Sequence, residues 1–232
     1  MKITVRGILF DMDGVLVSSL GSVERSWTTW AAKHGMEIAE AIRTAHGRRA
    51  IETVQLLRPD LDAIAETKYL EDLEVADNEG LEILGGVKPL LELLPENYWT
   101  VVTSATNRLA RSRMKAGGIP IPSRMITADM VDHGKPHPEP YLRGAELLGL
   151  KPSDCLVIED SASGAKAGHA AGCKVLATLF SHSLESLIAA DWIVQSLEDV
   201  RFTLAGDWIE LEFEPVPRQV AIEEVAEQAA KA

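Results

Sequence analysis

Short apolar runs recur along this chain, and stretches with helical periodicity separate them. The apolar runs lie at residues 7–10, 99–103, 156–158, 175–179 and 192–194. The clearest helical patterns between them lie at residues 109–116, 138–148 and 163–171. Strands that alternate with helices in this way are typical of a parallel sheet covered on both faces. We therefore expect an α/β fold with a doubly wound, Rossmann-like parallel sheet.

Residues 18–85 interrupt this alternation, because their apolar positions follow a helical period throughout and no convincing strand is visible. Gly85, Gly86 and Pro89 mark the return to the alternating pattern. We predict a core domain made of residues 1–17 and 86–232, with an inserted helical domain at residues 18–85. Such an insertion after the first strand would lie over the edge of the sheet as a lid.

The end of the chain has a weaker pattern. Residues 201–204 and 208–213 alternate around Ala-Gly-Asp, which predicts a hairpin, and residues 220–232 could form a terminal helix.

The bulk properties exclude several classes of protein. The 232 residues carry a net charge of −12, which disfavours a nucleic-acid partner. The sequence holds no apolar run long enough to span a membrane, and Asp11 and Asp13 interrupt the apolar N-terminus in a way that a signal peptide would not tolerate. Cys155 and Cys173 have no motif spacing, and we interpret them as small buried residues. We expect a cytoplasmic monomer without membrane contact.

Polar residues follow the predicted strands at the points where these strands end. Asp11 and Asp13 follow the first strand, and Ser104 follows the second. Lys135 lies in the segment HGKPHPEPY, and Glu159 and Asp160 follow the run LVI. Ligands of doubly wound sheets gather at the carboxyl ends of the strands. Each feature alone could be a turn, a helix cap or a solvated charge, but their combination predicts one active site.

Four segments carry a family resemblance. DMDGVLV, VVTSA, GKPHPEP and VIEDSASG resemble the four motifs of the haloacid dehalogenase-like hydrolases, and the match runs from about residue 8 to residue 179. The helical insertion looks like the cap domain of that family. The cap sequence and the stretch YLRGAELLGLKPSDCLVIEDSASGAKAGHAAGCKV look like bacterial sugar or hexitol phosphatases. They are also similar to the fungal phosphatases of glycerol 3-phosphate and 2-deoxyglucose 6-phosphate.

The resemblance implies a role for each motif in hydrolysing a phosphate ester. Asp11 would be the nucleophile that forms an aspartyl-phosphate, and Asp13 the general acid and base. Ser104 and the amide of Ala105 would donate hydrogen bonds to the phosphate oxygens. Lys135 would balance the charge of Asp11 and the phosphoryl group.

The resemblance also implies Mg²⁺ as cofactor, because a hard cation takes oxygen ligands and neutralises the transferring group. The expected ligands are the side chains of Asp11 and Asp160 and the backbone carbonyl of Asp13. Glu159 would bind the metal either directly or through water.

The cap should select the leaving group. The loop His46-Gly47-Arg48-Arg49 is the best candidate: His46, Gly47 and Arg49 would contact the substrate, and Asn107 after the second motif would also face it. The fungal phosphatases have a comparable His-Gly-x-Arg run. The expected substrate is a small phosphorylated sugar or polyol.

The chain departs from the family pattern at two places. Ser18 stands where an acidic residue is usual, and His137 stands where the third motif usually has Asp or Glu after Lys-Pro. The first change could loosen the hinge of the cap, and the second could change how Lys135 is held.

Several rival functions share part of the pattern. A phosphomutase of the β-phosphoglucomutase type shares all four motifs, but its cap carries a histidine roughly where Val23 stands. Asp13 argues against a dehalogenase, and a phosphonate hydrolase would need a cap lysine, for which Lys33 is the nearest candidate. A receiver-like regulator or an inactive binding protein would show no turnover of any phosphate ester.

Overall fold

Five parallel strands form the central sheet of the computed structural model, which describes residues 1–217. The strands are β2 (Gly7–Phe10), β5 (Trp99–Val101), β6 (Cys155–Glu159), β7 (Lys174–Thr178) and β8 (Trp192–Val194). They lie in the order β5-β2-β6-β7-β8, and all neighbouring pairs are parallel. The predicted α/β sheet is confirmed. β5 lies on one side of β2 and β6 on the other, so the order of the strands reverses at β2. Doubly wound sheets bind ligands at such a reversal, beyond the carboxyl ends of the strands.

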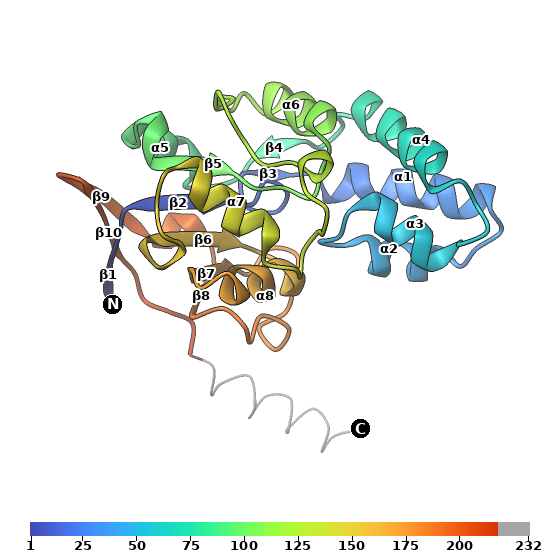
Figure 1. The fold of residues 1–232 in the computed structure, drawn as a ribbon. Helices are drawn as coiled ribbons and strands as arrows, with labels where there is room; N and C mark the ends of the chain where they lie inside the picture. Colours follow the sequence, from blue (N-terminus) through green and yellow to red (C-terminus); the bar gives the residue numbers. More distant parts are fainter. Residues whose placement is uncertain (218–232) are drawn as a thin grey trace, which may run out of the picture.

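Helices cover both faces of this sheet (Figure 1). They are α5 (Val87–Leu93), α6 (Asn107–Ala116), α7 (Glu139–Leu147) and α8 (Ala162–Ala170). The side chains of β2 alternate between the faces: Ile8 and Phe10 pack with α5 and α6, and Leu9 packs with α7 and α8. Burial on both faces explains why the strands read as continuous apolar runs. Short 3₁₀ turns complete the connections: Glu96–Tyr98, Ala128–Met130, Pro152–Asp154 and Leu197–Asp199.

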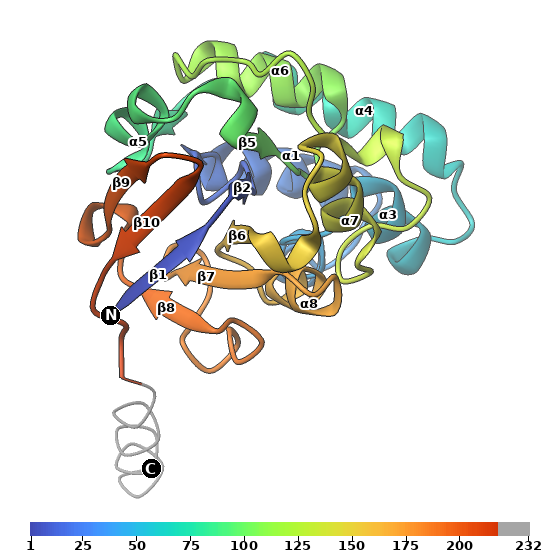
Figure 2. The same cartoon turned by 60° about the vertical axis from the view of Figure 1, so that its left-hand side comes forward.

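A second, antiparallel sheet lies beside the first (Figure 2). It consists of β1 (Lys2–Val5), β10 (Trp208–Glu212) and β9 (Arg201–Ala205) in that order. The predicted hairpin is confirmed as β9 and β10. The pairing of β1 with β10 was not predicted, because four residues with mixed exposure give too short a pattern. Residues 220–232, which could form a terminal helix or fray, lie outside the described residues.

Four helices form the proposed cap at one end of the sheet (Figure 1). They are α1 (Leu20–Lys33), α2 (Ile38–Ala45), α3 (Ala50–Leu57) and α4 (Ala63–Ala76). They enclose a hydrophobic cluster of their own, centred on Trp27, Trp30 and Leu70. The carboxylates of Glu37 and Asp62 accept hydrogen bonds from the first amides of α2 and α4 and so fix where these helices begin. A separate core of this kind supports the proposed domain division.

The expectation that this segment contains no strand is wrong at its two ends. β3 (Val17–Ser18) pairs antiparallel with β4 (Glu82–Ile83). Two residues on each side are too few to leave a periodic pattern in the sequence. Ser18, one of the two departures from the family pattern, therefore lies in the paired hinge. No helix among residues 1–217 is long and apolar enough to cross a bilayer.

Candidate active site

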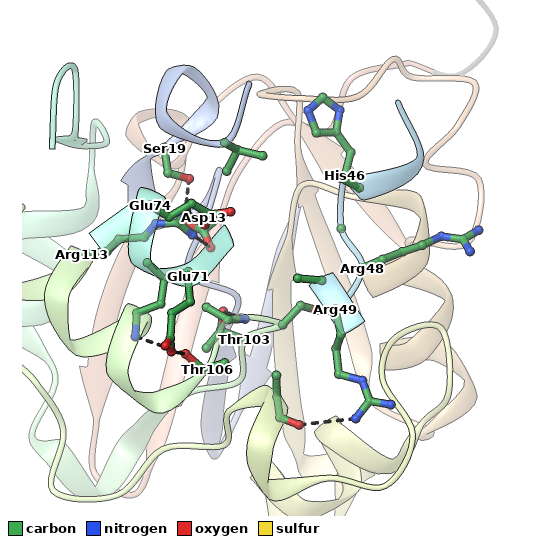
Figure 3. A pocket seen from close by; sticks show the side chains of 18 of the residues that line it. Asp13, Ser19, His46, Arg48, Arg49, Glu71, Glu74, Thr103, Thr106 and Arg113 are labelled. Carbon is green, nitrogen blue, oxygen red and sulfur yellow. Dashed lines mark hydrogen bonds and ion pairs between the residues drawn. The ribbon is translucent and has the colours of Figure 1, made fainter. Parts of the chain in front are cut away.

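A cavity of about 370 Å³ lies between the cap helices and the carboxyl end of the central sheet. It brings together most of the residues that the sequence predicts for the site: Asp11, Asp13, His46, Gly47, Arg49, Ser104, Ala105 and Asp160. Figure 3 shows His46 and Arg49 of the cap on one side of the cavity, and Asp13 and Arg113 of the core with Glu74 of the cap on the other. Residues that are far apart in the sequence thus line one cavity.

The loop after β2 places Asp11 at the floor of this cavity. The Asp11 amide donates to the carbonyl of Ile158 over 2.9 Å, which extends the pairing of β2 with β6 up to the carboxylate. Gly14 then turns the chain with a φ of +79°. A Cβ at Gly14 would lie 1.9 Å from Oδ2 of Asp160, so no other residue fits there without a shift. This glycine allows the first and fourth motifs to meet.

Lys135 is buried against two carboxylates. Its Nζ lies 2.8 Å from Oδ1 of Asp11 and 2.7 Å from Oε1 of Glu159, and its side chain is only 2% exposed. Burial alone would lower the pKa of Lys135, but the neighbouring charges of Asp11 and Glu159 raise it. The lysine therefore remains a cation beside the predicted nucleophile.

Glu159 accepts hydrogen bonds on both of its oxygens. Oε1 accepts from Lys135 and, over 2.7 Å, from the hydroxyl of Tyr141. Oε2 accepts from the amides of Asp160 and Ser161, each over 3.0 Å, and from the Ser161 hydroxyl over 2.9 Å. Glu159 is fully buried and does not line the cavity, whereas Asp11 and Asp160 do. Tyr141 lies in the quoted segment HGKPHPEPY, but nothing in its residue type predicted this contact.

The acidic cluster fits a divalent cation. Ligand oxygens of Asp11, Glu159 and Asp160 lie within 4.8 Å of one another. These three carboxylates face one buried cation, Lys135, so their full ionisation would leave two negative charges uncompensated. Burial, together with the charge of Glu159, raises the pKa of Asp11 to about 7 and also raises that of Asp160. Oxygen donors with an excess charge of two suit Mg²⁺ or a similar hard ion.

Asp13 is held by two residues that the sequence analysis missed. Its Oδ1 accepts from the Ser19 hydroxyl over 2.6 Å, and its Oδ2 accepts from Nη1 of Arg113 over 2.8 Å. Nη2 of Arg113 lies 2.5 Å from Oε2 of Glu74 in the cap. Figure 3 shows these four side chains gathered at one side of the cavity. A charged residue on the apolar face of α6, between Leu109 and Met114, was the available signal for Arg113.

The second motif supplies the floor beside Asp11. Ser104 and Ala105 both line the cavity, as predicted for phosphate contacts. The Ala105 amide donates to Oγ1 of Thr103 over 3.1 Å. The hydroxyl of Thr106 accepts from the Leu109 amide and so begins α6. Asn107 does not line the cavity, and its side-chain oxygen accepts from Nε of Arg111 over 2.9 Å.

The cap loop contacts the core directly at Gly47. The Gly47 carbonyl accepts from the Ser163 hydroxyl over 2.7 Å. A Cβ at Gly47 would lie 2.6 Å from that hydroxyl oxygen, and the φ of +71° also favours glycine. Gly47 was predicted to contact the substrate, and the close contact that the structure shows is with the core, beside the Asp160 loop.

Arg49 joins the cap to a second core loop. Its guanidinium donates to the carbonyls of Val131 and Asp132, each over 2.9 Å, and pairs with Glu52 over 2.5 Å. Arg49 thus lines the cavity with a side chain whose polar atoms already have protein partners.

His137 replaces the acidic residue that is usual in the third motif, but the loop that leads to Lys135 is still held in place. The carboxylate of Glu139 accepts from the amides of Asp132 and His133 over 3.0 and 2.9 Å. This contact orders the loop that precedes Lys135 without an acid at position 137.

Comparison with known proteins agrees with this geometry. The family model described as haloacid dehalogenase-like hydrolase matches residues 5–172 of this chain. The chain belongs to this family. It is 40% identical over 203 residues to the hexitol phosphatase A of Escherichia coli strain K12, covering 85% of this chain and 94% of that protein. It is 33% identical over 218 residues to glycerol-1-phosphate phosphohydrolase 2 of Saccharomyces cerevisiae, covering 87% and 86% of the two chains.

A solved structure shows the same fold. A hydrolase from Pseudomonas syringae superposes with a TM-score of 0.74 at 23% identity, covering 83% of this chain and 94% of that chain. Together, the family and its phosphatase relatives confirm the expectation that this haloacid dehalogenase-like hydrolase is a phosphoric monoester hydrolase.

Proposed function

We propose that this hydrolase removes phosphate from a small phosphorylated sugar or polyol, with Mg²⁺ as cofactor and Asp11 as nucleophile. One observation carries the proposal. Asp11 lies at the carboxyl end of β2, in contact with the buried cation of Lys135, on the floor of a cavity that cap and core residues line together. A carboxylate placed in this way can attack phosphorus while the neighbouring cation offsets the charge of the two reacting anions.

The proposed reaction has two steps. In the first, an oxygen of Asp11 forms a bond to phosphorus while the bond between phosphorus and the ester oxygen breaks, and Asp13 gives its proton to the leaving alkoxide. In the second, Asp13 takes a proton from water, whose oxygen bonds to phosphorus as the bond to Asp11 breaks. Inorganic phosphate leaves and Asp11 returns to its carboxylate. Ser104 holds phosphate oxygens in both steps, and the Ala105 amide joins it by exchanging its hydrogen bond to Oγ1 of Thr103 for one to the phosphate.

The metal would be held by the side chains of Asp11 and Asp160 and by the backbone carbonyl of Asp13. When bound, Mg²⁺ supplies charge neutralisation for the transferring phosphoryl group. We assign Glu159 a supporting role, since its oxygens already accept from Lys135, Tyr141 and the Asp160 loop. Its carboxylate orients Lys135 and can reach the metal through water.

The substrate class rests on the relatives. The names of two of them specify a hexitol phosphatase and a glycerol-1-phosphate phosphohydrolase, and both are covered over more than four fifths of their length. A cavity of about 370 Å³ accommodates a leaving group of this size. We also keep the expectations that the protein is a cytoplasmic monomer and binds no nucleic acid.

The alternative, a phosphomutase of the β-phosphoglucomutase type, has less support. Val23, which stands near the place of the mutase histidine, lines the cavity with an aliphatic side chain. Because valine neither exchanges a proton nor donates a hydrogen bond, nothing at this position directs a phosphorylated Asp11 towards a substrate hydroxyl and away from water.

Phosphate release from sugar, hexitol and glycerol phosphates tests the proposal. We expect release with Mg²⁺, little release with a chelator, and none from Asp11→Asn. Asp207→Asn is the matched control, because Asp207 is an exposed carboxylate in the turn between β9 and β10. No release from any ester by the folded wild-type protein would contradict the proposal, and interconversion of sugar phosphates would favour the mutase.

A further inference from the structure

The loop between β7 and β8 holds the carboxylate of Asp160 in place. Strands β6 and β7 are parallel neighbours, so the chain that leaves the end of β7 passes beside Asp160, which follows β6. There the hydroxyl of Ser181 donates a hydrogen bond to Oδ2 of Asp160. Gly14 also packs against this oxygen, because a Cβ at Gly14 would lie only 1.9 Å from it. Oδ2 is therefore occupied by contacts within the protein.

The second oxygen of the same carboxylate has no such contact. Oδ1 of Asp160 has no hydrogen-bond partner within residues 1–217, and Asp160 lines the cavity beside Asp11. A carboxylate that binds a metal presents one oxygen to the ion, and a hydrogen bond from an outer partner to the carboxylate fixes its orientation. Asp160 has this arrangement, since Ser181 holds Oδ2 and leaves Oδ1 for the proposed Mg²⁺.

Ser181 has a second partner in its neighbour His182. The distance from Oγ of Ser181 to Nδ1 of His182 is 2.7 Å. A serine hydroxyl has one hydrogen to donate, and an ionised carboxylate can only accept. Because the hydroxyl hydrogen goes to Asp160, Nδ1 of His182 must carry a proton and donate it to Oγ. The backbone carbonyl of Asp160 lies 3.5 Å from Oγ, which is too far to compete. His182, Ser181 and Asp160 thus form one chain of hydrogen bonds.

The environment of His182 suits its place in this chain. Burial and the neighbouring His46 lower the pKa of His182, so its imidazole is neutral around neutral pH and carries a single proton. Within the chain that proton lies on Nδ1. A histidine with this tautomer can only donate at Nδ1, which keeps the hydroxyl of Ser181 directed at the carboxylate.

We propose that Ser181 is a positioning residue for the metal ligand Asp160, and that His182 acts through Ser181 by fixing the direction of its hydroxyl. The inference rests on the proposed function, because it takes Asp160 as a ligand of Mg²⁺. It adds two residues that lie outside all four motifs. The outer partners of metal ligands typically account for a factor of about 10 to 100 in metal affinity.

Magnesium titrations of Ser181→Ala test the inference without and with turnover. We expect the Mg²⁺ concentration at half of the full rise in unfolding temperature to increase by about 10- to 100-fold. The Mg²⁺ concentration that half-saturates phosphate release should increase in parallel. At saturating Mg²⁺, kcat should stay within about twofold of the wild type, because Ser181 does not touch the reacting atoms in this account. Ser183→Ala, an exposed serine of the same loop, is the matched control.

Conservative variants separate the hydroxyl from the shape of the side chain. Ser181→Thr keeps the hydroxyl and should keep most of the Mg²⁺ affinity. His182→Asn keeps a side-chain N–H that can donate to Ser181, whereas His182→Leu has no donor. We expect His182→Leu to weaken Mg²⁺ binding, by less than Ser181→Ala does, and His182→Asn to stay closer to the wild type.

The double variant tests whether the two residues act as one chain. If His182 acts only through Ser181, then adding His182→Leu to Ser181→Ala should weaken Mg²⁺ binding no further. Effects that add in full would overturn the role assigned to His182.

The outcomes also separate this inference from the proposed function. If Mg²⁺ does not raise the unfolding temperature of the wild type, the proposed metal site fails. If the wild type responds and folded Ser181→Ala responds at the same Mg²⁺ concentration, the positioning role of Ser181 is overturned. A fall in kcat that saturating Mg²⁺ does not restore would also overturn it, because Ser181 would then act on the substrate.

Discussion

Arg113 donates a hydrogen bond from Nη1 to Oδ2 of Asp13 over 2.8 Å. The two residues come from different segments, α6 and the loop after β2, and Arg113 also pairs with Glu74 of the cap over 2.5 Å. The side chain of Arg113 is only 4% exposed. The proposed general acid and base is therefore oriented by a buried arginine whose second partner is supplied by the cap.

Replacing this arginine should impair the chemical steps. We expect Arg113→Met to lower kcat by about tenfold to a hundredfold, because a misplaced general acid and base loses part of a contribution of 10²- to 10⁴-fold. KM should change less, since Arg113 does not contact the phosphate in our account. Steady-state kinetics on the best ester measure both constants. Lys115→Met, an exposed position on the same helix, is the control. An unchanged kcat in the folded variant would show that Asp13 needs no such support.

Removal of Lys135 should destabilise the metal-free protein. Lys135→Met leaves the carboxylates of Asp11 and Glu159 buried without their cation, and breaking a buried pair in this way costs about 3–5 kcal/mol. Chemical denaturation in the presence of a chelator measures the free energy of unfolding. Lys151→Met at an exposed position is the matched change. Equal stabilities of the two variants would mean that the cluster is not ionised as we describe it.

Magnesium should stabilise the folded protein through the same cluster. Three carboxylates around one lysine carry an excess of two negative charges when all are ionised, a state that a bound cation favours. An ion that binds only the folded state, at a hundred times its dissociation constant, adds about 2.7 kcal/mol. Thermal unfolding against Mg²⁺ concentration should show a rising midpoint that a chelator reverses. Asp160→Asn should remove most of this rise. A midpoint that is insensitive to Mg²⁺, or a rise that is equal in Asp160→Asn, would contradict the assigned ligands.

Glu139 should make the stability sensitive to acid. Burial would raise the pKa of this carboxyl, but the hydrogen bonds from the amides of Asp132 and His133 lower it from 4.5 to about 2. A carboxyl whose pKa is depressed by folding stabilises the fold above about pH 4.5, and this contribution is lost as the pH falls towards 2. The difference in unfolding free energy between wild type and Glu139→Gln should therefore be largest at neutral pH and shrink below pH 4.5. A difference that stays constant from pH 7 to pH 3 would contradict this explanation.

Much of the fold could be predicted from the sequence because its strands are buried on both faces. Such strands leave continuous apolar runs, and all five strands of the central sheet overlap the runs that we identified. The hairpin of β9 and β10 could also be predicted, because alternating apolar residues and turn residues mark it in the sequence. Strands β1, β3 and β4 depend on partners far away in the sequence, and two to four residues carry too little pattern to reveal them.

The motifs of the proposed active site were similarly visible, because Asp11, Ser104 and Asp160 each follow a strand of the central sheet. The residues that support them were not. Arg113, Glu74 and Ser19 act through contacts between segments, and a single charge on a helix face does not reveal its partner. Arg49 shows the converse: its residue type predicted a substrate contact, whereas its guanidinium pairs with Glu52 and with core carbonyls. Sequence indicates which groups are present, and tertiary packing decides which of them remain free.

Direct detection of a phosphorylated Asp11 tests the central claim. In Asp13→Asn the second step lacks its base, so the phosphoenzyme should accumulate after mixing with a good phosphate ester and Mg²⁺. Mass spectrometry of the acid-quenched protein should place one phosphoryl group on the peptide that contains Asp11, and hydroxylamine should remove it, as it does from acyl phosphates. Phosphate release by the wild type without any labelled peptide in Asp13→Asn, or a label on another residue, would contradict the mechanism.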